Sequence, residues 1–564
     1  MRTTREHIFM RTVQNSRRLN PNKVIFINFK NPDMPSRAEP YPFAVLGGRL
    51  KNISPSIGIK TINADIDPHF FQSIGKSISE ERPILIGLRS SLGSLSDISQ
   101  AISIINEASG LPHPGIVIGG QIASYLPEKV FSLYPRAFVV AGEGEEAIDG
   151  LYKHALGQTS LDRIPNLFYF DANGIRSTFL KSFDPEKAVL PYRPPEETAA
   201  LISMGAAFIV ETSRGCHWGR CTFCPGGDIT SIYQNERGPN YKEFSVDHVI
   251  SQFESLAEMG VKNIQISDPD FSGGNSQRSR AVAEALIKSG NAINFKLTIR
   301  ADALFNRLKT PAENREKVKT FNMLKRAGLD KVFLGLESLV PTQRKRYFKG
   351  ILLEDNLRCL GILKTLGLDI EVGWIPIDPL MTLEEAEENV RLGVRFGIYP
   401  FAPKPLNMMR LHYGVPYVKM AEEAGLSVGP PEDNYLWHSY TFEPGTFKDE
   451  RVRSVALSSA KWYNETHHLY YGIKNILRTG NLPPKEMVAL GRILEDFKKL
   501  DIDFIYSMIN VEREKSAYKN NVLAHFKLRK KLLIEKLIGL CKNNVITNSL
   551  VIEELGNHGL WAGD

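Results

Sequence analysis

Short apolar runs alternate with helix-like patterns along residues 1–160. Five runs have the length and apolar character of buried strands: residues 23–28, part of 57–66, 83–88, 115–118 and 137–141. Stretches with the spacing of amphipathic helices lie between them, for example residues 95–108 and 146–156. Continuously apolar strands that alternate with helices are typical of a parallel sheet covered on both faces. The pattern predicts a doubly wound α/β domain over residues 1–160.

The next segment, residues 161–204, is expected to be a linker that contains a hairpin. Residues 164–170 and 174–179 flank the turn-rich sequence Asp171-Ala172-Asn173-Gly174, which favours the hairpin. The prolines that follow, from Pro185 to Pro195, favour an extended chain.

A second alternation fills residues 205–440. Its strand-like runs are residues 208–211, 263–267, 294–299, 331–335 and 369–377, and its helical patterns include 246–258, 318–327, 356–366 and 383–396. Repeated βα units predict a full or partial parallel barrel, in which chemistry takes place at the carboxyl ends of the strands. Polar residues do follow these strands: Asp268, Asp270, Arg300, Asp302, Glu337 and Asp378.

Residues 441–564 have a different character and carry no catalytic motif. Helical patterns cover residues 451–477, 484–506 and 511–540, and the last of these is rich in lysine. We therefore expect a mostly helical C-terminal domain.

Composition and charge limit the function classes. The 564 residues are 42% hydrophobic and 24% charged, which is ordinary for a globular protein of several domains. The formal charge of +7 is mild. The basic stretch 527–531 lacks the interleaved aromatic side chains that stack on bases, so a nucleic-acid partner is disfavoured. Neither a signal peptide nor a membrane-spanning run of about 18 apolar residues is evident, and we expect a cytoplasmic protein.

Three of the five cysteines lie close together, in Arg214-Gly215-Cys216-His217-Trp218-Gly219-Arg220-Cys221-Thr222-Phe223-Cys224. Three thiolates can hold three corners of a [4Fe–4S] cube and leave the fourth iron open to an outside molecule. The alternative is a zinc site with His217 as the fourth ligand, although adjacent Cys216 and His217 would make an awkward tetrahedral chelate. Cys359 and Cys541 lie in apolar helical patterns, where we interpret them as buried small hydrophobic residues.

Glycines follow two strands of the predicted N-terminal sheet. Gly119 and Gly120 end one run, and Gly142-Glu143-Gly144 ends another. Ligands of doubly wound sheets bind outside the carboxyl ends of the strands, and glycines there let a ligand approach the backbone. The first strand is not followed by Gly-x-Gly-x-x-Gly, which disfavours a nicotinamide dinucleotide.

Residues 205–410 resemble the radical S-adenosylmethionine (SAM) superfamily. The cysteine spacing here is C-x4-C-x2-C, one residue longer in the first gap than the usual C-x3-C-x2-C. Ile264-Gln265-Ile266-Ser267-Asp268 occupies the place of the family's Gly-Gly-Glu strand end, without its glycines. Gly335-Leu336-Glu337-Ser338 and Gly373-Trp374-Ile375-Pro376 match later strand ends of the family.

The resemblance implies SAM-binding roles for individual residues. Phe223 and the segment of Gly373 and Ile375 would lie by the adenine. Glu337 and Ser338 would lie near the ribose. Asp268 would contact the SAM amino group, and Arg300 would meet the SAM carboxylate. The alternatives are that Asp268 and Glu337 cap helices and that Arg300 pairs with Asp302.

Residues 23–150 resemble the cobalamin-binding domain that precedes many such barrels. The matching segments are residues 42–50, 116–120 and 141–145, and they imply cobalamin contacts at Gly119, Gly120, Gly142, Glu143 and Gly144. The Asp-x-His-x-x-Gly loop of cobalamin mutases is absent. The alternative is an empty relic of a cobalamin site. The expected fold is α/β: a Rossmann-like parallel sheet, a partial radical SAM barrel and a helical C-terminal domain.

The two resemblances together imply a cobalamin-dependent radical SAM enzyme that methylates an unactivated carbon. Cys216, Cys221 and Cys224 would hold the [4Fe–4S] cluster, SAM would be cleaved reductively, and cobalamin would carry the methyl group. The implied partners are a small-molecule or peptide substrate and an electron donor such as flavodoxin or ferredoxin. A radical cyclase or rearrangement enzyme, with or without cobalamin, and a non-catalytic scaffold stabilised by zinc or a cluster remain open.

Overall fold

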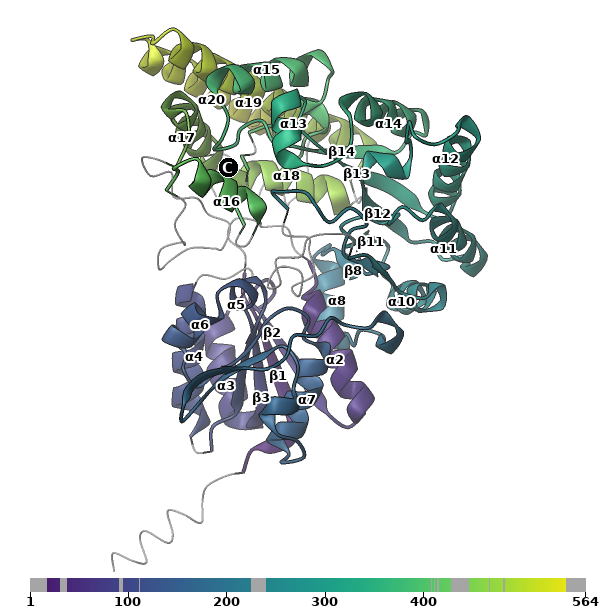
Figure 1. Ribbon diagram of the computed structural model, residues 1–564, viewed down its shortest axis with the longest axis vertical. Coiled ribbons are helices and arrows are strands. Elements are labelled where there is room, and N and C mark those ends of the chain that lie inside the picture. Colours follow the sequence, from purple (N-terminus) through teal and green to yellow (C-terminus); the bar gives the residue numbers. More distant parts are fainter. Residues whose placement is uncertain are drawn as a thin grey trace, which may run out of the picture.

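The structure is a computed structural model that shows an N-terminal sheet domain, a barrel-like domain and a helical C-terminal part (Figure 1). The residues that it describes are 18–30, 38–90, 95–110, 112–224, 240–406, 408–409, 411–412, 415–427, 446–465, 467–479 and 482–543.

The N-terminal sheet has seven strands in the order β2-β1-β3-β4-β5-β6-β7. Their bounds are β1 Asn20–Asn28, β2 Gly58–Asn63, β3 Pro83–Arg89, β4 Gly115–Gly119, β5 Phe138–Val140, β6 Leu167–Asp171 and β7 Gly174–Ser177. The first five strands pair in parallel, as predicted, and β6 and β7 form the predicted antiparallel hairpin. The hairpin pairs with β5 and so extends this sheet, whereas the sequence predicts that it is part of the linker.

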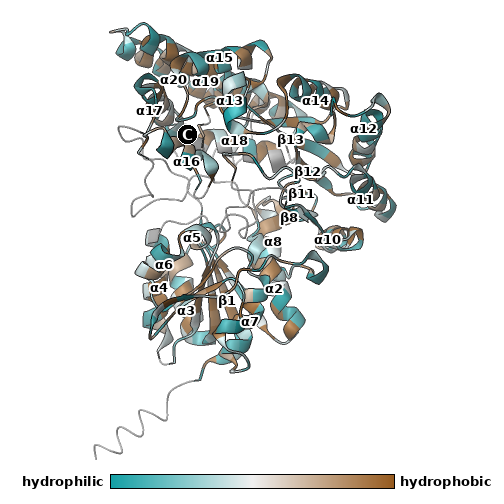
Figure 2. Ribbon diagram, viewed as in Figure 1, coloured by the Kyte–Doolittle hydropathy of each residue, from teal (hydrophilic) through white to brown (hydrophobic). Residues whose placement is uncertain are grey.

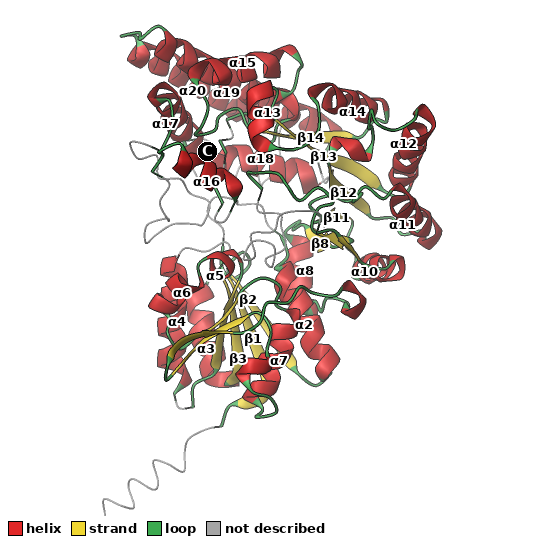
Figure 3. Cartoon of the chain, viewed as in Figure 1, coloured by secondary structure: helices red, strands yellow, loops and turns green. Residues whose placement is uncertain are grey.

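Helices cover both faces of this sheet (Figure 3). Their bounds are α2 Tyr41–Ile53, α3 Phe70–Glu81, α4 Leu95–Ser109, α5 Gln121–Tyr125, α6 Pro127–Leu133 and α7 Glu145–Ala155. Side chains of β1 alternate between the two faces: Ile25 and Ile27 pack with α3 to α6, whereas Val24 and Phe26 pack with α2 and α7. Both faces of the strands are therefore apolar, which Figure 2 shows as brown strands.

The second sheet is the expected partial barrel. Its five strands, in the order β14-β13-β12-β11-β8, all pair in parallel. The bounds are β8 Phe208–Val210, β11 Asn263–Ile266, β12 Asn294–Ile299, β13 Leu329–Glu337 and β14 Asp369–Trp374. A short antiparallel pair follows β8, made of β9 Ser213–Arg214 and β10 Lys242–Glu243.

Helices surround the partial barrel. Their bounds are α8 Pro195–Ser203, α10 Val246–Glu258, α11 Ser276–Ser289, α12 Pro311–Arg326, α13 Pro341–Tyr347, α14 Leu353–Thr365, α15 Leu383–Arg395 and α16 Pro416–Glu423. Thr310, just before α12, and Thr382, just before α15, each form a capping box. The threonine hydroxyl accepts a bond from the N–H of the glutamate three residues later, and that glutamate's carboxylate accepts a bond from the threonine N–H. Single turns of 3-10 helix lie at η1 Leu161–Arg163, η2 Pro185–Lys187, η3 Ala301–Ala303 and η4 Tyr399–Phe401.

A buried ion pair joins the two sheets. Glu39 lies just before α2, and its carboxylate accepts two bonds from Arg193 of the linker, at 2.7 and 3.0 Å. The Glu39 carboxylate also accepts a bond from the backbone N–H of Ile209 on β8, and the Glu39 N–H donates to the oxygen of Ala207 at 2.9 Å. Both charged side chains are only 3% exposed. These bonds fix the strand ends of the N-terminal sheet relative to β8.

The C-terminal helices are α17 Glu450–Asn464, α18 His467–Thr479, α19 Pro484–Arg513 and α20 Lys519–Lys542. Three of the predicted boundaries were wrong. The range 451–477 holds two helices. Helix α19 continues to Arg513, two residues before Lys515 takes a left-handed conformation, and α20 begins at Lys519 rather than at residue 511. Lys474 of α18 pairs with Glu371 of the edge strand β14 at 3.0 Å, so this part covers the open side of the barrel. None of the described helices is long and apolar enough to cross a bilayer.

Candidate functional site

A cavity of about 550 Å³ lies where the two sheets face each other. Strands β1, β3, β4 and β5 line it from the N-terminal sheet, together with α2 and the start of α7. Glu211, Arg214, Gly215, Asn240, Lys242 and Pro269 line it from the barrel. The strand order places this cavity at the reversal between β1 and β3, where ligands of such sheets bind. Its volume is in the range of about 300–1,000 Å³ that is usual for ligand sites.

The predicted glycines form one wall of this cavity. Gly119, Gly120, Gly142, Glu143 and Gly144 all line it. A Cβ atom on Gly119 would stand in open space, with no atom within 4 Å, so this wall is left bare for a ligand. Gly120 and Gly142 have φ of 105° and 86°, a region that favours glycine. The sequence Asp67-Pro68-His69 lies between β2 and α3, and His69 does not line the cavity.

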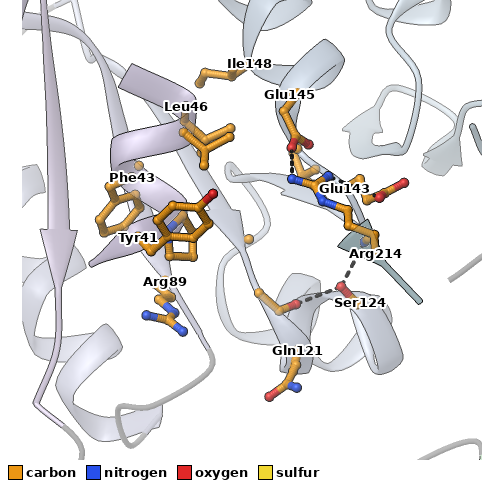
Figure 4. Close-up of a pocket in the computed structure, with 18 of the residues that line it drawn as sticks. Tyr41, Phe43, Leu46, Arg89, Gln121, Ser124, Glu143, Glu145, Ile148 and Arg214 are labelled. Carbon is orange, nitrogen blue, oxygen red and sulfur yellow. Dashed lines mark hydrogen bonds and ion pairs between the residues drawn. The ribbon is translucent and has the colours of Figure 1, made fainter. Parts of the chain in front are cut away.

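Apolar side chains of α2 form the opposite wall. The rings of Phe43 and Phe26 stack at 4.7 Å, and Tyr41 and Leu46 lie beside Phe43 (Figure 4). An apolar plate therefore faces the bare glycine wall. This arrangement fits a flat, bulky ligand with polar edges.

One guanidinium joins the two domains at the cavity rim. Arg214 of β9 pairs with Glu145 at 2.6 Å, with Glu211 at 2.8 Å and with Glu143 at 3.2 Å (Figure 4). Burial opposes the charge of Arg214, but Glu211 and Glu145 raise its pKa well above the ordinary value. Burial also raises the pKa of Glu211, against the effect of Arg214. Because Arg214 precedes Cys216 by two residues, this cluster connects the cavity to the cysteine loop.

The cysteine loop is held on two sides by backbone hydrogen bonds. Asn240 accepts a bond from the N–H of Cys216 at 3.0 Å, and a Cβ on Gly215 would meet the Asn240 oxygen at 2.3 Å. On the other side Thr222 donates its N–H to the oxygen of Tyr347 at 3.0 Å and its hydroxyl to the oxygen of Arg346 at 2.7 Å. The one-residue-longer loop is therefore hydrogen-bonded to the C-terminal end of α13.

The three thiols fit a cluster better than a single ion. Cys216, Cys221 and Cys224 form no disulfide bond and are half-buried. Among the described residues, the one group of ligand atoms within 4.8 Å of one another is Cys216, His217 and Asp270. The three thiols are thus not all this close, whereas zinc would hold its sulfur ligands roughly 3.8 Å apart. A zinc ion at Cys216 would leave Cys221 and Cys224 without a role.

Cations surround the thiols. Burial raises the pKa of the Cys221 thiol to about 12, while Lys349 and Arg300 act in the opposite direction. Burial opposes the charge of Lys349 too, but Glu337 and Cys221 raise its pKa. A site with two buried cations against three thiols is suited to a ligand that makes the sulfurs anionic.

Arg300 and His217 form an ion-pair network beside the loop. Arg300, at the end of β12, donates to Asp302 at 3.2 and 3.1 Å and to the oxygen of Lys349 at 3.0 Å. The His217 ring lies between Asp270 and Asp302. Burial opposes the charge, but these carboxylates raise the pKa of His217 to about 9. Arg300 therefore does pair with Asp302, and it also interacts electrostatically with Cys221 and Cys216.

The end of β13 is shaped around the Glu337 side chain. Glu337 has φ of 70°, rare for a residue other than glycine, and its carboxylate pairs with Lys349 at 2.9 Å. A Cβ on Gly335 would lie 2.9 Å from Glu337 Oε1, and one on Gly373 would lie 3.1 Å from Glu337 Oε2. Both glycines thus make room for this carboxylate. The backbone N–H of Ile375 donates to the backbone oxygen of Glu337 at 2.8 Å, so Glu337, Gly373 and Ile375 lie together.

The remaining predicted residues are more deeply embedded. Asp268 is 1% exposed and accepts bonds from Thr212 and from the hydroxyl of Ser213, so its oxygens brace the entry to the cysteine loop. Burial raises the pKa of Asp268 to about 6. Ser338 is fully buried and bonds within its own turn, to Val340. Three of the roughly four hydrogen bonds that the Asp268 carboxylate can accept are thus made within the protein.

Phe223 packs against a buried cluster that the sequence did not indicate. Its ring lies 4.9 Å from that of Tyr347. The hydroxyls of Tyr347 and Tyr417 both donate to Asp378, and the Tyr417 N–H donates to the Thr222 oxygen at 2.9 Å. Lys349, Tyr347 and Tyr417 escaped prediction because no motif marks them. The sequence marks Asp378 only as a polar residue that follows a predicted strand.

Comparisons with known proteins agree with this architecture. The sequence model of the radical SAM superfamily matches residues 210–393. The 4'-phospho-dehydrooxetanocin synthase of Priestia megaterium is 28% identical over 328 residues, which are 56% of this chain and 43% of that protein. The hopanoid C-3 methylase of Methylococcus capsulatus is 22% identical over 345 residues, 60% of this chain and 61% of that protein. The chain thus aligns with less than two thirds of each of these two relatives.

Two solved structures share the fold. The cobalamin-dependent SAM radical enzyme OxsB, with aqua-cobalamin and SAM bound, has a TM-score of 0.78 at 20% identity and covers 96% of this chain and 84% of its own. The radical SAM methyltransferase TsrM of Kitasatospora setae has a TM-score of 0.55 at 16% identity and covers 73% of this chain and 78% of its own. The predicted radical SAM domain is thereby confirmed. Residues 210–393 are a domain of the radical SAM superfamily, within a chain that shares the fold of OxsB and TsrM.

Proposed function

We propose that this protein is a cobalamin-dependent radical SAM enzyme that transfers a methyl group to an unactivated carbon of a small molecule or peptide. The observation that carries the proposal is the cavity, because it is bounded at once by the bare glycines of the N-terminal sheet and by Arg214 and Gly215 of the cysteine loop. Two cofactors bound at these places would face each other across the domain boundary.

The thiols of Cys216, Cys221 and Cys224 would hold the [4Fe–4S] cluster. The cluster would supply reductive cleavage of SAM, and cobalamin would supply a carrier for the methyl group. Arg300 and Lys349 place positive charge beside the sulfurs. Glu337, Gly335 and Gly373 lie together at the strand ends, where the SAM ribose and adenine would bind.

The N-terminal residues would hold the corrin ring. Gly119 and Gly142 let a flat ring lie on the backbone, and Phe43 covers the other side of the cavity. The carboxylates around Arg214 can accept hydrogen bonds from amide groups at the edge of the ring. The apposed domains would also keep water from the reacting atoms.

A radical rearrangement or cyclisation is the second candidate. It is favoured by the 28% identity to a synthase rather than a methylase, and by the likeness to OxsB over 96% of the chain. Product analysis separates the two. Methyl transfer that uses two SAM molecules per turnover releases S-adenosylhomocysteine and 5'-deoxyadenosine in equal amounts, whereas rearrangement releases 5'-deoxyadenosine or restores SAM.

The test uses SAM with a deuterated methyl group and the anaerobically reconstituted protein with a strong reductant. Candidate nucleotides, other small molecules and peptides are supplied in turn, and products are followed by mass spectrometry. A product that is heavier by one deuterated methyl group, with equal amounts of both SAM products, is expected. An isomerised or dehydrogenated product without the label would contradict methyl transfer. We expect the reaction in the cytoplasm, where thiols stay reduced.

A further inference from the structure

The carboxylates around Arg214 can accept more hydrogen bonds than Arg214 can supply. Its guanidinium contacts Glu143 and Glu145 of the N-terminal domain and Glu211 of the barrel (Figure 4). A carboxylate accepts about four hydrogen bonds and a guanidinium donates five, so three carboxylates around one guanidinium leave acceptor capacity unused. All three carboxylates belong to residues that line the cavity. The rim of the cavity is therefore suited to a ligand that brings further N–H donors.

The Arg214 side chain is held in place from several directions. Its guanidinium lies 5.0 Å from the centre of the Phe183 ring and 5.6 Å from that of Phe244. Glu143 is held in turn, because its carboxylate accepts a bond from the backbone N–H of Phe183 at 2.5 Å. A change in the position of Glu143 is thus passed to Arg214 by an ion pair and by a shared aromatic neighbour.

The backbone carries the position of Arg214 directly to the first cysteine. Arg214 pairs with Lys242 across the β9–β10 ribbon. At the next position, a Cβ on Gly215 would lie 2.3 Å from the backbone oxygen of Asn240. The N–H of Cys216 donates to the side-chain oxygen of Asn240 at 3.0 Å, and the N–H of Asn240 donates to the oxygen of Cys216 at 3.3 Å. Because the chain from Arg214 to Cys216 lies against residues 240–242 at every step, a shift of Arg214 has to move Cys216.

The residues on the other side of Arg214 position Asp268. The backbone N–H of Thr212 donates to the Asp268 carboxylate at 2.8 Å, and the Ser213 hydroxyl donates to it at 2.7 Å. The resemblance to radical SAM enzymes implies that Asp268 lies by the SAM amino group. The segment 212–216 therefore carries a cluster ligand and braces a residue of the SAM site, and Arg214 is at its centre.

We propose that Arg214 is a positioning residue that couples occupancy of the cavity to SAM binding at the cysteine loop. Amide N–H groups at the edge of a corrin ring would use the spare acceptors of Glu143 and Glu145 and reduce the repulsion between the carboxylates. All three carboxylates can then close on Arg214 and fix the segment 212–216. Cobalamin and SAM should consequently strengthen each other's binding. The inference rests on the proposed function, because it requires both cofactors.

The test measures this coupling as a ratio of affinities. Titration calorimetry gives the affinity of the anaerobically reconstituted, full-length protein for SAM with and without saturating hydroxocobalamin, and for hydroxocobalamin with and without SAM. The variants are Arg214→Met, Arg214→Lys and Glu145→Gln. Arg49→Met is the matched control, because Arg49 is a similarly buried arginine whose partner, Asp149, belongs to the N-terminal domain. Iron content and circular dichroism establish that each variant is folded and loaded.

In the wild type each cofactor should raise the affinity for the other by the same factor, about fivefold or more, because coupling between two sites is reciprocal. Arg214→Met and Glu145→Gln should bring this factor to within about twofold of one. Arg214→Lys keeps the charge but not the planar fork, so it should retain part of the coupling. The control should keep the wild-type factor. A merely structural role of Arg214 would lower both affinities and leave their coupling unchanged.

Two results would overturn the inference: a wild type that binds both cofactors without coupling, or variants that keep the wild-type factor. If Arg214→Met does not fold, Glu145→Gln decides, since it replaces one carboxylate by an amide of the same shape. Failure of the proposed function would differ, because the wild type would then retain no hydroxocobalamin or bind no SAM, and the inference would fail with it.

Discussion

Removing one partner of the Glu39–Arg193 pair should destabilise the protein far more than removing both. The two side chains are 3% exposed, and their bidentate contact joins the linker to the segment before α2. Glu39→Met leaves a buried guanidinium without its counter-charge, which costs about 3–5 kcal/mol. It also leaves the N–H of Ile209 without its acceptor, which adds about 1–3 kcal/mol.

The double variant Glu39→Met, Arg193→Met removes both charges and keeps most of the volume. Only the N–H and the C=O of Ile209 lose their partners, so its loss should be about 2–6 kcal/mol, smaller than that of either single variant. Lys309→Met is the control, because Lys309 and Glu313 are about half-exposed and their pair should contribute less than about 1 kcal/mol.

The assay is urea unfolding followed by far-ultraviolet circular dichroism and tryptophan fluorescence. The free energy of unfolding of each variant is taken from the shift in midpoint and the slope. Retention of hydroxocobalamin after desalting is recorded in parallel, because the pair sets how the two cavity walls face each other. Single variants that lose less than about 1 kcal/mol, or a double variant that loses the sum of both, would refute the reasoning.

Three further results are expected. Gly119→Val should place its side chain in the open cavity and lower hydroxocobalamin retention at least fivefold, whereas Gly491→Val, also without neighbours within 4 Å, should not. Equal retention would show that the ligand does not lie on this wall. Gly373→Ala should displace the Glu337 carboxylate and weaken SAM binding by calorimetry, with unchanged iron content; normal SAM affinity would contradict the assignment of this pocket. Burial raises the pKa of Asp501 to about 7, above its unfolded value, so the folded state holds the extra proton and stability should fall as pH rises from about 4 to 7. Asp268, whose pKa is also raised, contributes a slope of the same sign, so Asp501→Asn should reduce the slope in urea unfolding, and an unchanged slope would contradict the reasoning.

Periodicity predicted the two parallel sheets because buried parallel strands are continuously apolar. Successive side chains of β1, from Val24 to Ile27, pack alternately against the helices on the two faces of the sheet. Every position is therefore buried and apolar. The same signal does not mark where a helix ends inside an apolar pattern, and so the end of α19 at Arg513 was misplaced. It also gave no indication that the hairpin would pair with β5, since strand pairing is a long-range contact.

Local motifs predicted the residues expected to contact the cofactors, but not the residues that hold them in place. The cysteine trio and the strand-end glycines are read directly from the chain, and the structure brings the glycines together around one cavity. Lys349 and Tyr417 lie 125 or more residues from Cys224 and reach the site only through folding, as do Glu143 and Glu145 beside Arg214. Their partners are non-local, and no spacing rule connects them.

The central claim is that the cysteine loop and the glycine-walled cavity form one two-cofactor site. It is tested most directly by the absorption spectrum of protein reconstituted without oxygen, incubated with hydroxocobalamin, desalted, and then given SAM and a reductant. Iron–sulfur and cobalamin absorption together, with release of 5'-deoxyadenosine that Cys221→Ala abolishes, is the predicted result. A colourless protein that keeps neither cofactor, or one whose SAM cleavage survives the loss of Cys221, would contradict the account.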